Sequence, residues 1–202
     1  MPLKFANNQS LTGTTALPSS VPTDNLILIS TQTASSSATI SFTTGLNSTY
    51  DEYIFKFINI HPATDGADFT FNMSTDSGSN YNVTKTTTNF QAFHTEADAT
   101  SLAYVTANDL AQGTGFQVIG DGIGNGADES VSGTLTLFNP SSTVYVKHFI
   151  ATTNGYRTND ASYNTFTAGY GNTTSAVNAI QFKFSGGNVD DGVFKLYGVK
   201  KS

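Results

Sequence analysis

The chain has 202 residues, contains neither cysteine nor tryptophan, and only 12% of its residues are charged, about half the fraction usual in a soluble domain. The missing cysteine excludes disulfide scaffolds, thiolate zinc sites and cysteine nucleophiles. The net charge is −6 and no run of Lys or Arg exceeds two residues, so we expect no binding to nucleic acid or to a membrane surface. The 15 Phe and 9 Tyr exclude a disordered tail.

The first 24 residues differ from the rest of the chain. They contain Pro2, Pro18 and Pro22 among many Ser and Thr, which predicts an extended arm too polar to form its own core. They show no apolar stretch typical of a signal peptide, and no window of the chain approaches the 18 apolar residues of a membrane span. Residues 25–202 are expected to form one domain.

Strand signals begin at residue 25. Period-two alternation or short apolar runs predict strands at 26–29, 38–43, 53–60, 69–73 and 81–85. The turn-forming residues between the last two segments predict that they form a hairpin.

The segment 90–112 is less regular, with its only plausible helical turn at 96–102 and a short strand near Tyr104. Further strands are predicted at 116–119, 131–137, 144–150, 163–168, 177–184 and 193–199. The turn residues indicate two more hairpins, 131–137 with 144–150 and 177–184 with 193–199. About ten consecutive antiparallel strands predict an all-β, jelly-roll-like sandwich.

Five lysines stand inside these predicted strands: Lys56, Lys85, Lys147, Lys183 and Lys195. Lysine in a strand is typical of solvent-facing positions, where it discourages edge-to-edge aggregation. We therefore expect all five side chains to point into solvent.

No catalytic motif is present. The three histidines, His61, His94 and His148, lack the spacing of a metal site. Neither a Gly-x-Ser-x-Gly turn nor a phosphate-binding loop occurs. Two acids from distant loops could still meet as in glycoside hydrolases, but no pattern favours this, so a non-enzymatic protein is expected, with no cofactor.

One loop is a weak candidate for calcium. Residues 121–129 read Asp-Gly-Ile-Gly-Asn-Gly-Ala-Asp-Glu, and Asp121, Asn125 and Asp128 offer oxygen ligands. Ile123 and Ser132 fall where an EF-hand requires oxygen ligands, so the loop is not an EF-hand. A flexible glycine turn is the favoured interpretation.

Tyrosines, amides and the only arginine gather near residue 160. Aromatic rings can stack on sugars while polar groups bind hydroxyls, and the same residue types suit protein interfaces. The candidates for contact with a glycan or a partner are Tyr156, Arg157, Asn159, Asp160, Tyr163 and Tyr170. The alternative is that these tyrosines cap the end of a sandwich.

Two segments resemble a known group of proteins. Residues 180–188 (Ile-Gln-Phe-Lys-Phe-Ser-Gly-Gly-Asn) with 192–199 (Gly-Val-Phe-Lys-Leu-Tyr-Gly-Val) resemble the C-terminal hairpin of tailed-bacteriophage virion proteins. Residues 50–62 (Tyr-Asp-Glu-Tyr-Ile-Phe-Lys-Phe-Ile-Asn-Ile-His-Pro) are similar to strands of the same group, notably in marine phages.

This resemblance implies a structural protein of the virion, assembled in the host cytoplasm and exposed on the particle, commonly as a homotrimer. A short tail fibre or receptor-binding component is the leading expectation, and a capsid-decorating protein is the alternative. Residues 1–24 would dock the domain onto other virion proteins, while the domain faces a host glycan or protein. An alternative from another class is a free carbohydrate-binding module or a polysaccharide hydrolase.

Overall fold

The computed structural model describes residues 25–201, so the predicted N-terminal arm lies outside the described residues. The described chain forms twelve strands and no helix, and every strand pair is antiparallel. The predicted all-β antiparallel class is therefore confirmed, with two strands more than the ten expected. No helix in the described residues is long and apolar enough to cross a membrane.

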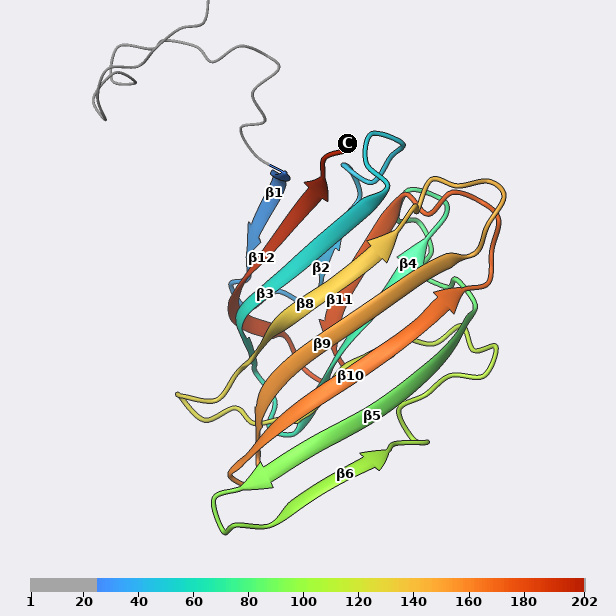
Figure 1. Ribbon diagram of the computed structural model, residues 1–202. Helices are drawn as coiled ribbons and strands as arrows, with labels where there is room; N and C mark the ends of the chain where they lie inside the picture. The colour runs from blue at the N-terminus through green and yellow to red at the C-terminus, as the bar shows by residue number, and fades with distance from the viewer. Residues whose placement is uncertain (1–24, 202) are drawn as a thin grey trace, which may run out of the picture.

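The strands form two layers, which Figure 1 shows one behind the other. The larger layer is, in order across the sheet, β1 (Leu26–Thr33), β12 (Val189–Val199), β3 (Glu52–Pro62), β8 (Val131–Phe138), β9 (Lys147–Arg157), β10 (Ala161–Gly171), β5 (Lys85–Thr95) and β6 (Thr100–Tyr104). The smaller layer is β2 (Ile40–Phe42), β11 (Ala179–Phe184), β4 (Ala67–Ser74) and β7 (Gln117–Ile123).

A single residue pair joins the two layers. Ile123 on β7 pairs with Arg157 on β9, so hydrogen bonding continues from one layer into the other. The result is one nearly closed sheet, closer to a barrel than to a sandwich of two separate sheets.

The core between the layers is aromatic. Phe182 on β11 lies at its centre with its ring between 5.0 and 6.3 Å from those of Phe42, Phe55, Phe57, Phe69, Phe71 and Phe194. Most of these pairs meet edge-on or tilted, the geometries that the ring quadrupoles favour. Alternation explains the burial, because every second residue of β3, β4 and β11 points to the same side.

Only one of the three predicted hairpins forms. β8 pairs with β9 as expected. The hairpin of 69–73 with 81–85 is wrong, because β4 pairs with β7 and β11 while Lys85 begins β5. The hairpin of 177–184 with 193–199 is also wrong, because β11 belongs to the smaller layer and β12 to the larger. The predicted helical turn at 96–102 is instead a tight turn followed by β6.

The inner face of β5 and β10 is polar. Lys85, Thr87, Asn89 and Gln91 point inward from β5 and are buried. Residues 105–113 lie along this strand, with backbone hydrogen bonds from Val105 to Asn89, from Thr87 to Leu110 and between Lys85 and Gly113. The loop and the smaller layer thus cover this face together. Thr87 donates to Gln117 Oε1 of β7, Asn89 donates to the Val118 carbonyl of the same strand, and the Leu110 amide of the loop donates to Thr87 Oγ1.

Two of the five strand lysines do not face solvent. Lys85 and Lys147 are fully buried, which corrects the expectation for these positions. The Lys85 ammonium donates to Asn72 Oδ1 at 2.5 Å and to the Val83 carbonyl at 2.8 Å. The Lys147 ammonium donates to the Tyr145 and Thr173 carbonyls. Backbone and amide oxygens therefore solvate both ammonium groups inside the protein.

Candidate functional site

Two turns meet at one end of the large layer. The β9–β10 turn, residues 158–160, and the β5–β6 turn, residues 96–99, are linked by a hydrogen bond from the Glu96 amide to the Asp160 carbonyl. Because neighbouring residues of a strand face opposite sides, Tyr156 points to the outer face of the sheet and Arg157 to the inner face. A separate hollow lies on each face.

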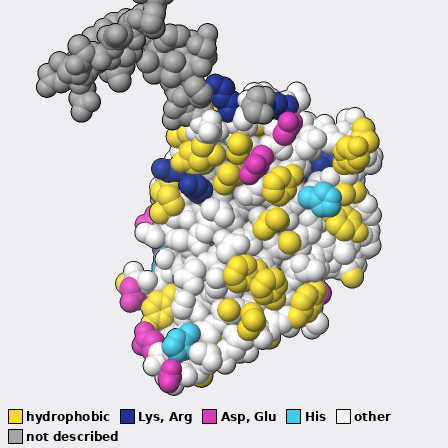
Figure 2. All heavy atoms as spheres, viewed as in Figure 1, with side chains coloured by type: hydrophobic (Ala, Val, Ile, Leu, Met, Phe, Trp, Pro, Cys, Tyr) yellow, Lys and Arg dark blue, Asp and Glu magenta, His cyan; other side chains and the backbone are white. Residues whose placement is uncertain are grey.

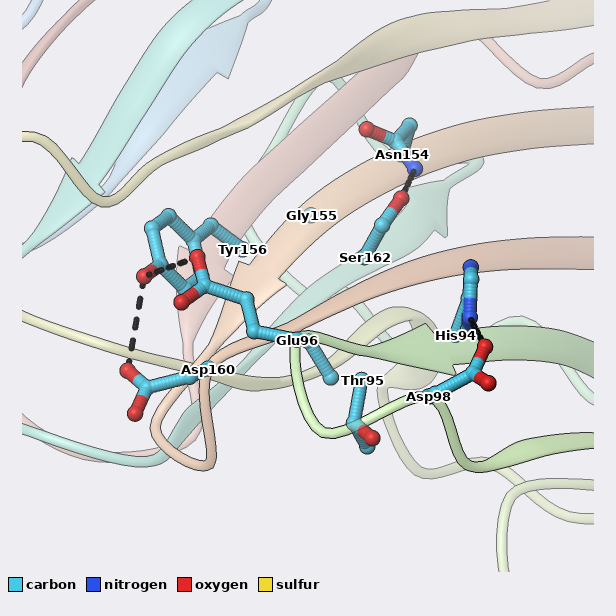
Figure 3. Close-up of a pocket in the computed structure, with 10 residues that line it drawn as sticks. His94, Thr95, Glu96, Asp98, Asn154, Gly155, Tyr156, Asp160 and Ser162 are labelled. Atoms are coloured by element: carbon cyan, nitrogen blue, oxygen red, sulfur yellow. Dashed lines mark hydrogen bonds and ion pairs between the residues drawn. The ribbon is translucent and has the colours of Figure 1, made fainter.

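The outer hollow, of about 500 Å³, is shown in Figure 3. Tyr156 lies on one side of it, and its hydroxyl is 3.4 Å from both Glu96 Oε1 and Asp160 Oδ1. Desolvation and these two carboxylates raise the pKa of Tyr156 to about 12. The hydroxyl therefore stays protonated at neutral pH and acts as a hydrogen-bond donor, not as a base.

Most of the other side chains around the outer hollow are polar and exposed, and the buried residues Gly155 and Ala161 complete its lining. His94 pairs with Asp98 at 3.1 Å, and Asn154 donates to Ser162 Oγ at 2.8 Å. Apart from His94, the charged residues that line it, Glu96, Asp98 and Asp160, are acidic. This hollow offers acceptors to a ligand but no aromatic wall other than Tyr156.

The inner hollow, of about 390 Å³, combines an aromatic wall with buried polar groups. Its aromatic wall consists of Phe93 and Tyr163, stacked with ring centroids 4.9 Å apart and planes 11° from parallel. Its polar side chains include Gln91, Asn108, Asp121 and Arg157, and Ser101, Ala103, Val105 and Ala107 complete the lining. Ser101 and Ala103 lie opposite Phe93 and Gln91 across β5 and β6, and their small side chains leave the space open.

Arg157 connects the polar groups to the aromatic wall. Its guanidinium carbon lies 4.6 Å from the centre of the Tyr163 ring, and Nη2 lies 3.3 Å from Asp121 Oδ2. Gly122 makes this position available, because a Cβ there would collide with the guanidinium and the backbone has a φ of +60°. Only glycine adopts that conformation readily.

Besides its ion pair with Arg157, Asp121 accepts a hydrogen bond and lies next to another carboxylate. Its Oδ1 accepts from Asn108 Nδ2 at 3.3 Å. Asp68 lies beside it and accepts from the Gly122 amide at 2.8 Å. Burial, with a further contribution from the charge of Asp121, raises the pKa of Asp68. One arginine thus faces two carboxylates.

The structure separates the six contact residues expected from the sequence. Tyr156 and Asp160 line the outer hollow, while Arg157 and Tyr163 line the inner one. Asn159 is exposed in the turn. Tyr170 lies at the far end of β10, beside His148 at 6.1 Å, in a third hollow on the outer face.

The three weak calcium candidates have separate surroundings. Asp121 is paired with Arg157, and Asn125 hydrogen-bonds with its amide to Asp65 and with its side chain to the Ala63 carbonyl. Asp128 lines a shallow hollow beside His61. Within residues 25–201, no three His, Asp or Glu side chains are grouped to hold a metal ion.

Sequence reasoning missed Gln91, Phe93 and Asn108. Gln91 is 6% exposed, and its amide nitrogen has no hydrogen-bond partner. Gln91 and Phe93 could have been found from the alternation of side chains along β5, which places every odd-numbered residue from 85 to 93 on the inner face. Asn108 comes from a loop, and no local pattern predicts its position.

Comparisons with known proteins found no matching family model, no similar curated protein and no similar solved structure. The function is therefore argued from the residues themselves.

Proposed function

We propose that the chain is a non-enzymatic structural protein of a tailed-phage particle, exposed on its surface as a short tail-fibre or receptor-binding component. The proposal starts from the sequence resemblance. Residues 50–62 contain β3 and residues 192–199 fall in β12; these strands lie side by side in the large layer, with Tyr197 opposite Ile54. Residues 180–184 belong to β11 of the smaller layer, so the C-terminal segments of the resemblance do not pair as a hairpin. Residues 1–24 are proposed to dock the domain onto other virion proteins.

The observation that carries the proposal is the outer face of β9, β10, β5 and β6. The outward positions of these four strands contain no Lys, Arg, Asp or Glu. They do contain exposed apolar side chains, and Figure 2 shows apolar groups gathered over this face with charges near its edges. The most exposed are Phe90, Leu102, Tyr104 and Ile150, at 41, 72, 51 and 53%.

Such a face suits contact with other protein chains. Interface cores are depleted in charge and enriched in aromatic residues, and little charge must be desolvated when two such faces meet. Phe90 and Phe166 stack at 4.8 Å in the middle of the face. We propose that copies of the chain associate through it as a homotrimer, the state that the resemblance implies.

The experiment is sedimentation of the full chain beside a variant that carries Phe90→Lys and Leu102→Lys. The wild type is expected to be a trimer and the variant a monomer, because central aromatic residues at interfaces often contribute about 2 kcal/mol or more. The variant loses the stacking of Phe90 on Phe166 and the stabilisation that association would give, so its Tm should fall, while its circular dichroism spectrum should remain that of the folded wild type. A wild type that stays monomeric at high concentration contradicts the proposal.

The place on the particle needs a second experiment. Mass spectrometry of purified particles counts the copies of the chain: a few dozen or fewer indicates a tail component, and hundreds indicate capsid decoration. Particles assembled with a chain lacking residues 2–24 test the docking role, since normal incorporation of that chain contradicts it. Release of reducing ends from a host polysaccharide by the chain contradicts the non-enzymatic assignment.

A further inference from the structure

We infer that the inner hollow is a binding site for a neutral saccharide. The inference deepens the proposed function, because it names the class of receptor that an exposed particle component would bind. It stands on a different face of the sheet from the proposed interface between copies.

The first step concerns the aromatic surface. Phe93 and Arg157 both approach the Tyr163 ring within 5 Å, so they occupy its two faces. The surface left for a ligand is that of Phe93, which is only half-buried and has Ser101 as its neighbour on β6. An aromatic face carries partial negative charge and therefore attracts the slightly positive C–H groups of a sugar ring.

The second step concerns hydrogen bonding. A sugar hydroxyl both donates and accepts, so it is best bound between a donor and an acceptor. Asp121 offers acceptor sites, and Arg157 offers donors beyond the one directed at Asp121. Gln91 lines the same wall with an amide nitrogen that is buried and has no partner. Buried polar groups are normally satisfied, so this amide points to a missing polar ligand.

The third step concerns charge. Among the lining residues, Arg157 and Asp121 compensate each other's charge, and Gln91 and Asn108 are neutral. Asp68, the second carboxylate near Arg157, is not part of the lining and adds negative charge that disfavours an anionic ligand. An anionic or cationic ligand would have to compete with one member of the Arg157–Asp121 pair for the other. A neutral ligand with several hydroxyls keeps the pair intact. The cavity of about 390 Å³ falls in the range of small-molecule sites.

The full chain is tested by saturation-transfer NMR against methyl glycosides of glucose, galactose, mannose and N-acetylglucosamine, with glucuronic acid as the charged probe. At least one neutral glycoside should bind more tightly than glucuronic acid. The affinity for it should fall about tenfold in Phe93→Ala. The control is Tyr145→Ala, since Tyr145 is an aromatic residue 70% exposed in the segment before β9 and lines neither the inner nor the outer hollow.

A second variant keeps the test decisive if Phe93→Ala does not fold. Ala103→Leu fills the space beside Gln91 without removing a contact, and it should abolish binding. Binding of none of the four neutral glycosides, preferential binding of glucuronic acid, or equal losses in Tyr145→Ala and Phe93→Ala would each overturn the inference. None of these results touches the oligomer and particle experiments, so a failure here is distinguishable from a failure of the proposed function.

Discussion

Burial of Lys85 makes stability depend on pH in a direction opposite to that of a surface lysine paired with an acid. The side chain is fully buried, its ammonium contacts only neutral oxygens, and burial lowers its pKa from 10.5 to about 7. The unfolded chain binds a proton here up to about pH 10.5, whereas the folded chain releases it near pH 7. Between these values the unfolded state holds more protons, so stability rises with pH.

The magnitude follows from the same two pKa values. One pKa unit corresponds to about 1.36 kcal/mol, and half of the folded molecules have already lost the proton at pH 7. Raising the pH from 7 to 9 should therefore stabilise the fold by about 2 kcal/mol, or raise Tm by roughly 4–8 °C for a chain of this size. Burial also lowers the pKa of Lys147, which adds to the effect in the same direction.

The assay is thermal or urea unfolding of the wild type and of Lys85→Met at half-unit steps from pH 7 to 9. The wild type should gain stability across the range, and the variant should lose most of that gain. Lys195→Met serves as a control, since Lys195 is a partly exposed lysine of β12. A flat wild-type profile, or an equal slope in Lys85→Met, would refute the reasoning.

Three further predictions concern the core and the inner hollow. Phe182→Ala should lower the free energy of unfolding by about 3–5 kcal/mol, because it leaves a cavity in the aromatic core; urea titration measures this, and a loss below about 1 kcal/mol would contradict the central packing. Gly122→Ala should lower the free energy of unfolding by about 1–2 kcal/mol because of the positive φ at this position. The added Cβ should also displace the Arg157 guanidinium and change its NMR signal. An unchanged signal would count against the close approach of Arg157 to residue 122. Asp68→Asn should equal or exceed the wild type in Tm at pH 7, because burial raises the pKa of Asp68 and its charged form therefore destabilises the fold. The difference in Tm should vanish below about pH 4, where the carboxyl is protonated in both states. A loss of stability at pH 7 would contradict the prediction.

Local pattern predicted strands well and strand partners poorly. Alternation or apolar runs found β3, β4, β8 and β11; β8 has one buried face, whereas β4 is buried on both. The hairpin of β8 with β9 was predicted correctly, because the two strands are consecutive and the turn-forming residues 139–142 lie in the connection 139–146. The other two hairpins failed because β4 and β11 pair with strands distant in sequence, and no local signal encodes such a choice.

The buried lysines show a second limit. Lys85 is in phase with Thr87, Asn89 and Gln91, all of which point inward. A pattern of polar residues gives no sign of which face is covered, because here the loop 105–113 and the strands β4 and β7 supply the contacts. The polar sequence of β5 therefore predicted an exposed face, whereas the tertiary structure buries it.

The site was predicted in part. Arg157 and Tyr163 do come together, at 4.6 Å. Grouping Tyr156 with Arg157 ignored the alternation of a strand, which puts adjacent residues on opposite faces. Asp121 was only a weak calcium candidate, in a loop for which a glycine turn was favoured. No local pattern predicted that it pairs with Arg157, a contact between β7 and β9 that is set by the closing of the two layers.

The position of β12 has a consequence for how the protein is made. Among the described residues this strand comes last, yet it lies between β1 and β3, which precede it by more than a hundred residues in the sequence. Until residues 189–199 leave the ribosome, β1 has no partner in the sheet and β3 has one open edge. The large layer is therefore expected to close only once residues 189–199 are available, and slowly, as is typical of pairings between distant segments. In that interval the nascent chain exposes two strand edges, and it depends on chaperones or on rapid docking of β12 to avoid aggregation.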